Sequence, residues 1–247
     1  VLDAVYAYFP PEDETEEERE LIRIAVVGKP NAGKSSLINK ILGENRVIVS
    51  NIPGTTRDAI DTYLTRGEKQ YCFIDTAGMR KRGRVTENIE RYSVMRSLSA
   101  VDRSDVVILV VDAADGISEQ DSKIAGYAHN QGKAFIIAVN KWDLIEKDTN
   151  TMNKFRNKVY EELPFMMYVP VIFISALTGQ RVEKVFEMAD FVANQAAFRV
   201  PTGMLNDVLA EAIAVAQPPS DKGKRLKLFY MTQIKVKPPT FAIFCNS

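Results

Sequence analysis

The sequence predicts an α/β fold: a mostly parallel sheet covered by helices on both faces, followed by a smaller α+β unit. Two observations support the larger part. Short apolar runs alternate with helix-length stretches along most of the chain, and polar motifs directly follow several of these runs, where open parallel sheets bind ligands. After residue 198 the composition becomes basic and the order changes to one helix and two strands.

The apolar runs define the expected strands of the larger part. They lie at residues 22–27, 71–74, 106–111, 134–139 and 171–174, and the expected helices between them include 35–43, 88–98 and 121–130. Near-continuous apolar runs are typical of parallel strands that are buried on both faces. The first helix is expected to stop at Gly43.

We expect three segments along the chain. Residues 1–20 form a tail and an acidic interdomain linker, because residues 10–20 combine two prolines with seven acids. Residues 21–198 form the nucleotide-binding domain described below. Residues 199–247 carry seven Lys or Arg against three acids, with a helix at 204–216 and strands at 225–236 and 240–245. No closing helix follows, so we expect this unit to be incomplete.

Composition excludes several classes of protein. The 247 residues are 46% hydrophobic, which suffices for a core, and the 32 Lys and Arg balance the 32 Asp and Glu. Attraction to nucleic acid must therefore come from local patches. The longest aliphatic run is far short of the roughly 20 residues of a membrane span, and there is no targeting signal. Cys72 and Cys245 suggest no disulfide framework, so we expect two buried thiols and a cytoplasmic protein.

Residues 28–35, GKPNAGKS, match the phosphate-binding pattern G-x-x-x-x-G-K-[ST] between a predicted strand and a predicted helix. Gly28 and Gly33 let the backbone wrap around phosphate oxygens. Lys34 supplies a charge to the β and γ phosphates, and the Ser35 hydroxyl can ligate Mg²⁺. A chance match in a glycine turn has a prior of about one in a hundred at this length, and the context lowers it further.

The tetrapeptide DTAG begins at Asp75, directly after the run at 71–74. Asp75 can hold Mg²⁺ through a water molecule, and the amide of Gly78 can sense a γ phosphate, which makes a hydrolysis-dependent switch possible. Taken alone the motif is weak, because an aspartate that caps a loop explains it better.

The tetrapeptide NKWD begins at Asn140 and indicates the base. Asp143 can accept from both the N1–H and the amino group of guanine, whereas adenine lacks both donors in that arrangement. Such a site can discriminate by roughly 10⁴-fold or more. We expect Asn140 at the other edge of the base, the stem of Lys141 over its face, and the amide of Ala176, within the tripeptide SAL, at the base carbonyl oxygen.

These motifs each follow a predicted strand, in the order that one nucleotide requires. They predict a protein that binds GTP with Mg²⁺ and hydrolyses it to GDP and phosphate. The expected nucleotide-binding residues are Gly28, Lys29, Pro30, Asn31, Ala32, Gly33, Lys34, Ser35, Ser36, Asp75, Gly78, Asn140, Lys141, Asp143, Ser175, Ala176 and Leu177.

Together with PGTTRD at residues 53–58, the motifs resemble those of the TrmE, Era and EngA group of P-loop GTPases. The resemblance implies that Thr56 ligates Mg²⁺ together with Ser35 and Asp75. The alternative for PGTTRD is an ordinary polar turn after Pro53.

Met79 follows DTAG, where Ras-like enzymes have a water-orienting glutamine. Methionine cannot orient water by hydrogen bonding. In relatives of this group a potassium ion held by the phosphate-loop asparagine supplies positive charge, and Asn31 matches that asparagine. The resemblance thus implies a K⁺ site at Asn31 and catalytic roles for Lys34, Asn31, Thr56 and Gly78.

Within the group, the acidic linker, PGTTRD, NKWD and KPPTF near Thr240 are similar to the EngA family, also called Der. The resemblance covers nearly the whole chain: residues 21–198 match a second GTPase domain, and residues 199–247 match the start of a KH-like domain. It implies a switch in assembly of the large ribosomal subunit, with that subunit, its rRNA and an upstream GTPase domain as partners.

RNA contact stays open on two points. The C-terminal unit has no GXXG clamp of the kind with which ordinary KH domains grip a nucleic-acid backbone. The basic run RKRGR, residues 80–84, suits either rRNA phosphates or a solvated loop, and the loop is the default. The alternatives to a ribosome-assembly GTPase are a TrmE- or Era-like enzyme of tRNA modification or small-subunit maturation, a nucleotide-stabilised scaffold, and, least favoured, an ATP-using enzyme.

Overall fold

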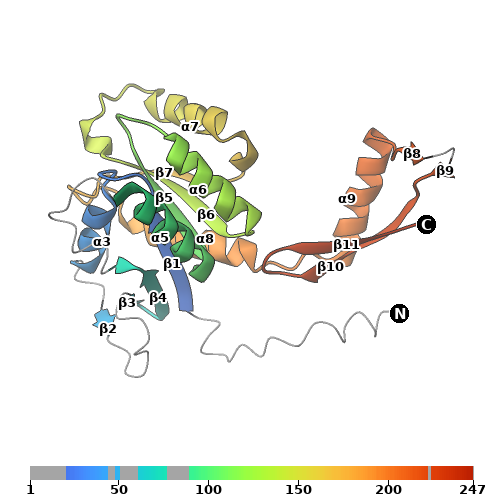
Figure 1. Cartoon of the computed structure of the whole chain (residues 1–247), viewed down its shortest axis with the longest axis horizontal. Helices are drawn as coiled ribbons and strands as arrows, with labels where there is room; N and C mark the ends of the chain where they lie inside the picture. The colour runs from blue at the N-terminus through green and yellow to red at the C-terminus, as the bar shows by residue number, and fades with distance from the viewer. Residues whose placement is uncertain (1–20, 44–47, 51–60, 77–88, 222–223, 247) are drawn as a thin grey trace.

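The computed structural model describes residues 21–43, 48–50, 61–76, 89–221 and 224–246. Its centre is a seven-stranded sheet with the strand order β2-β3-β4-β1-β5-β6-β7 (Figure 1). Strands β4, β1, β5, β6 and β7 are parallel, whereas β3 and β2 continue the sheet in antiparallel pairing. The predicted α/β class with a mostly parallel sheet is confirmed.

The elements follow the predicted alternation of strand and helix. The strands are β1 (Leu21–Val27), β2 (Ile48–Ser50), β3 (Thr62–Arg66), β4 (Lys69–Ile74), β5 (Val106–Asp112), β6 (Ala134–Asn140) and β7 (Val171–Phe173). The helices are α3 (Lys34–Leu42), α5 (Ile89–Arg103), α6 (Glu119–Asn130), α7 (Thr151–Glu162) and α8 (Glu183–Ala196), and the short 3₁₀ helices are η1 (Trp142–Leu144) and η2 (Pro164–Met166). The two antiparallel strands at the edge, β2 and β3, were not predicted, because they lack a continuous apolar run.

The sheet has a separate apolar layer on each face, which explains why its central strands are apolar at every position. In β5, Val107 and Leu109 pack into the layer beneath α5, α6 and α7, while Val106 and Ile108 pack into the layer beneath α3 and α8. All seven residues of β5 are buried. The carboxyl ends of the parallel strands are consequently held in fixed relative positions by packing on both sides.

The C-terminal unit consists of α9 (Thr202–Val215), the short pair β8 (Ser220–Asp221) and β9 (Lys224–Arg225), and the antiparallel hairpin of β10 (Leu228–Lys235) and β11 (Thr240–Cys245). The side chain of Asn206 joins α9 to β10, because it donates to Met231 O at 3.1 Å and accepts from Met231 N at 2.9 Å. Gln233 is 3% exposed and accepts from Val200 N at 2.8 Å, which anchors the connection from α8.

The two cysteines lie in different environments. Cys72 in β4 is buried, but Cys245 is exposed, so the expectation of two buried thiols is wrong for Cys245. The reason is that β11 belongs to a two-stranded sheet whose side chains are largely exposed among the described residues. No helix in the described ranges combines the length and the apolar character of a membrane span.

Candidate nucleotide site

The loop between β1 and α3 has a backbone that only glycine fits at two positions. Gly28 has φ +134° and Gly33 has φ +101°, values that L side chains rarely adopt. An added Cβ at Gly28 would lie 2.3 Å from Val110 O, and one at Gly33 would lie 2.0 Å from Asn140 Nδ2. The loop is therefore pressed against the ends of β5 and β6.

The N-terminus of α3 is suited to an anion. Its N-cap, Gly33, has no side chain to cap the helix, and the first turn holds no acidic residue, so the helix itself places no carboxylate at the positive end of its dipole. Lys34 Nζ donates to Gly28 O at 2.7 Å and to Lys29 O at 2.6 Å, which folds its charge over the loop. Ser35 lies in the same turn, while Pro30, Asn31 and Ser36 are exposed.

Asn140 ties three of the predicted motifs together. Its side chain is 2% exposed, donates from Nδ2 to Ala32 O at 2.8 Å and accepts at Oδ1 from Ala176 N at 2.9 Å. The phosphate loop, NKWD and SAL are thus in direct contact. The predicted base contacts need a refinement: the Ala176 amide is already engaged with Asn140, and Nδ2 has one further hydrogen for a base atom.

The carboxylate of Asp143 lies in η1, directly after β6. The neighbouring Trp142 anchors this turn. Its ring packs against Phe155 and Phe173 at centroid distances of 5.0 Å and 4.4 Å, and its main-chain N–H donates to Ile174 O at 3.1 Å. Asp143 Oδ1 is buried and has no hydrogen-bond partner among the described residues. A buried acceptor without a partner is costly, so this oxygen is suited to a donor that the described residues do not supply.

Lys141 is held by an ion pair. Its Nζ lies 2.6 Å from Asp112 Oδ2, at the end of β5, and the Asp112 side chain is only 7% exposed. Burial alone would raise the pKa of Asp112, but the hydrogen bonds from Lys141 and from the amide of Ala114, with the charges of Lys141 and Lys29, together hold that pKa below its ordinary value. The ammonium end of Lys141 is thereby held at the end of β5.

The SAL tripeptide forms a tight turn after β7. Ser175 is fully buried and Ala176 is 4% exposed, whereas Leu177 is 81% exposed. Ser175 Oγ accepts from Thr178 N at 3.1 Å, which stabilises the turn. The structure therefore brings Ser175 and Ala176 to the site, and leaves Leu177 pointing to solvent.

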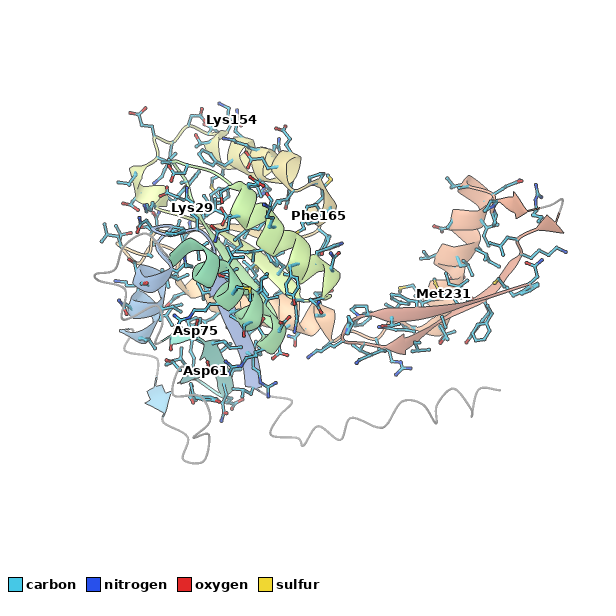
Figure 2. All side chains as sticks on the ribbon, viewed as in Figure 1. Lys29, Asp61, Asp75, Lys154, Phe165 and Met231 are labelled. Atoms are coloured by element: carbon cyan, nitrogen blue, oxygen red, sulfur yellow. The ribbon has the colours of Figure 1, made fainter. Side chains whose placement is uncertain are left out.

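Asp75 follows β4, the neighbour of β1, and so lies at the same edge of the sheet as the phosphate loop. It has φ +55°, and its N–H donates to Asp61 Oδ1 at 2.9 Å (Figure 2). Asp61 also pairs with Arg103 at the end of α5. This network holds the start of DTAG to the segment before β3. Thr56, Gly78, Met79, PGTTRD and RKRGR lie outside the described residues.

Comparison with known proteins identifies both parts of the chain. Residues 23–141 match the family described as 50S ribosome-binding GTPase, and residues 199–247 match the family described as the C-terminal KH-domain-like part of EngA bacterial GTPase enzymes. GTPase Der of Ruminiclostridium cellulolyticum is 64% identical over 246 residues and GTPase Der of Acetivibrio thermocellus 60% over 247, in each case with 100% of this chain aligned. Over its whole length the chain is thus similar to GTPases of the EngA (Der) family. It spans 56% of the length of each of these two relatives.

Solved structures agree with the fold of this chain. Era in complex with MgGDPNP and part of 16S ribosomal RNA superposes with a TM-score of 0.53 at 21% identity, covering 92% of this chain and 78% of that one. An Era variant of Aquifex aeolicus bound to GDP and AlF4⁻ gives 0.52 at 20% identity, with the same coverages of 92% and 78%. At these identities the likeness concerns the fold.

Three acidic residues of the site were missed by sequence reasoning. Asp112 holds Lys141, Asp61 holds the amide of Asp75, and Asp121 accepts from Lys29 N at 3.0 Å. The position of Asp112 at a strand end was the one available signal. Asp61 and Asp121 resemble ordinary loop and helix-cap residues in the sequence, because their partners lie far away along the chain.

Proposed function

We propose that this chain binds GTP and GDP with Mg²⁺ at the site described above, hydrolyses GTP, and uses that cycle as a switch in assembly of the large ribosomal subunit. The observation that carries the proposal is the buried Oδ1 of Asp143, which has no partner within the described part of the chain and lies at the sheet edge that also carries the phosphate loop. A carboxylate in that setting requires donors, and guanine presents two adjacent ones at N1–H and its amino group.

The phosphates are proposed to bind along the loop from Gly28 to Ser36. The close approach of Gly28 and Gly33 to β5 and β6 sets the loop beside the N-terminus of α3, whose first turn holds no acidic residue and is suited to an anion. Lys34 now bonds two loop carbonyls, and we infer that it exchanges these neutral acceptors for the β and γ phosphates, which bind its charge more strongly.

The donors for Mg²⁺ fit that ion. Ser35, in the first turn of α3, supplies a hydroxyl oxygen, and Asp75, directly after β4, supplies a carboxylate. The strands that lead to them, β1 and β4, are adjacent in the sheet, and hard oxygen ligands with few protein contacts are what Mg²⁺ prefers next to a nucleotide phosphate. When bound, the ion neutralises charge that develops between the β and γ phosphates. Thr56 is proposed as its third protein ligand.

For hydrolysis, we infer that K⁺ bound at Asn31 replaces the glutamine of Ras-like enzymes. Asn31 is exposed on the phosphate loop with φ +63°, so its side-chain oxygen is accessible to an ion beside the phosphates. Lys34, Thr56 and the amide of Gly78 complete the proposed catalytic set. Thr56 and Gly78 would also be the points at which loss of the γ phosphate releases the switch segments.

The partner side of the proposal rests on the family. The matched description names 50S ribosome binding, and the Der relatives extend well beyond this chain. We therefore propose the large ribosomal subunit and its rRNA as partners, an upstream GTPase domain as a neighbour in the full-length protein, and the cytoplasm as the location. The match of residues 199–247 to the EngA C-terminal family favours this over TrmE- or Era-like roles.

Replacement of Asp143 by asparagine tests base recognition. Asp143→Asn exchanges one carboxylate oxygen for an amide donor, which no longer suits the guanine amino group but suits the carbonyl that xanthine carries at that position. We expect GDP affinity to fall by about 100-fold or more and xanthosine diphosphate affinity to rise. Glu146→Gln, the same chemical change at an exposed position three residues on, is the matched control. Unchanged GDP affinity in Asp143→Asn would overturn guanine recognition.

Single-turnover GTP hydrolysis tests the rest of the proposal. The wild-type chain is measured in KCl and in NaCl, each with and without large ribosomal subunits, and Asn31→Ala is measured alongside. We expect faster hydrolysis in KCl, and expect Asn31→Ala to remove the difference between the salts. Equal rates in both salts would exclude the potassium role, and no effect of large subunits on the rate or on association would count against the ribosomal role.

A further inference from the structure

Asp121 is a fully buried carboxylate that connects α6 to the phosphate loop. It lies in the first turn of α6 and is 0% exposed. Its Oδ1 accepts from Lys29 N at 3.0 Å, across 92 residues of sequence, while Oδ2 accepts from Ser118 N at 3.0 Å and Ser118 Oγ at 2.7 Å. Both oxygens are therefore used, in two separate directions.

The contact of Asp121 with Lys29 completes a network that holds every polar group of that residue. The Lys29 amide is bound by Asp121, the Lys29 carbonyl accepts from Lys34 Nζ at 2.6 Å, and the Lys29 ammonium pairs with Asp115. Asp115 and Asp121 both belong to the segment that leads from β5 into α6. That segment thereby fixes the part of the loop against which Lys34 rests.

A hydrogen bond from a main-chain N–H to an ionised carboxylate is stronger than one to a neutral acceptor, and burial shields it from water. The Lys29 peptide consequently has little freedom to rotate. Rotation of that residue would move the carbonyl that Lys34 uses and would change the course of the loop before Asn31. The Asp121 carboxylate, in α6, thus restrains the backbone of the phosphate loop at Lys29.

We propose that Asp121 is a positioning residue for phosphate binding: by holding the amide of Lys29, it sets the conformation of the phosphate loop and the approach of Lys34 to the β phosphate. The inference rests on the proposed nucleotide function and names a residue that supports it from outside the loop. Asp121 acts through Lys29 and does not itself touch the nucleotide.

The same carboxylate also belongs to a helix cap, and the two roles can be separated. Ser118 and Asp121 form a capping box, in which Ser118 Oγ accepts from Asp121 N at 3.2 Å and Oδ2 of Asp121 accepts in return. Ser118→Ala removes the capping hydroxyl but leaves Oδ1 on Lys29. Asp121→Ala removes the contact with Lys29 as well. Comparison of these two variants therefore separates the effect on the phosphate loop from the effect on the stability of α6.

The test compares wild type, Ser118→Ala and Asp121→Ala in binding GDP and GMP, measured by displacement of a fluorescent GDP. GMP lacks the β phosphate that Lys34 contacts, so a disturbed loop weakens GDP much more than GMP. We expect Asp121→Ala to lose about tenfold or more in GDP affinity, the size of one hydrogen bond to a charged group, with GMP affinity nearly unchanged. Ser118→Ala is expected to lower the midpoint of thermal unfolding without changing the GDP-to-GMP ratio.

The outcomes separate this inference from the proposed function. Wild type that binds no GDP would refute the function itself, whereas wild-type GDP affinity in Asp121→Ala, or an equal loss for GDP and GMP, would refute only the positioning role. If Asp121→Ala does not fold, amide exchange in the nucleotide-free wild type decides the question. The Lys29 amide is expected to exchange about 100-fold or more slowly than in an unstructured chain, and exchange at the unprotected rate would overturn the inference.

Discussion

Gly33 lies so close to Asn140 that a side chain at position 33 would collide with it. A Cβ on Gly33 would lie 2.0 Å from Asn140 Nδ2, far inside the contact distance of real side chains. Because Gly28 holds the same loop close to Val110 of β5, we expect the Asn140 side chain to move. That movement breaks its bonds to Ala32 O and Ala176 N, at 2.8 Å and 2.9 Å. Gly33→Ala is therefore expected to separate the phosphate loop from the SAL turn.

Two costs add up to the expected loss in the free energy of unfolding of Gly33→Ala. An alanine held at positive φ costs about 1–2 kcal/mol. Two buried hydrogen bonds are lost in addition, at about 1 kcal/mol each. We expect Gly33→Ala to lower the free energy of unfolding by about 3–4 kcal/mol and to abolish measurable nucleotide binding.

The matched control is Gly67→Ala, in the turn between β3 and β4. Gly67 has φ +64°, but an added Cβ there has no heavy atom within 4 Å among the described residues. Only the backbone term applies, so we expect a loss of about 1–2 kcal/mol and unchanged nucleotide affinity. Urea denaturation followed by circular dichroism gives the free energy of unfolding of each variant. Equal losses for the two variants would show that the contact between Gly33 and Asn140 contributes nothing, and would refute the reasoning.

Two further predictions concern ionisable groups. The pKa of Asp112 lies below its ordinary value, so its contribution to stability is complete above about pH 4 and is lost as the pH falls through the folded-state value. Lys141→Met leaves that carboxylate buried without its partner. Urea titrations from pH 3 to 7 should therefore show the largest deficit against wild type near pH 7, and a deficit that stays constant with pH would contradict the ion pair. Burial raises the pKa of Cys72 to about 11, whereas Cys245 is exposed, so Ellman's reagent at pH 8 should modify Cys245 in the native protein and reach Cys72 only after unfolding.

Prediction from sequence worked best where the signal is local. The five parallel strands and the helices around the motifs were located because continuous apolar runs and glycine-rich turns leave few alternatives. Strand β3 was missed because it is short, lies beside the sheet edge and mixes Thr and Arg with its apolar residues. Cys245 was misjudged for a related reason, since an apolar strand does not reveal whether both of its faces are covered.

The base-recognition motif shows the limit of reasoning from motifs alone. Asp143 was expected to face guanine, and its buried oxygen, which bonds to none of the residues that the structure describes, supports the proposal. Asn140 was assigned to the base alone, yet its amide also bridges two loops that lie 108 and 36 residues away in sequence. A spacing pattern identifies the residue type that a ligand needs, but it does not reveal which other groups the same side chain bonds.

The sequence by itself determined the class of sheet and the order of the nucleotide motifs, and it predicted a preference for guanine, because these depend on residue type, local periodicity and position at strand ends. Only the tertiary structure decided how the motifs are held in place. Asp121 looks like the cap of its own helix, and its bond to Lys29 appears only when α6 packs against the phosphate loop. Contacts between segments about 90 residues apart depend on how the layers pack, and no local pattern of amino acids encodes them.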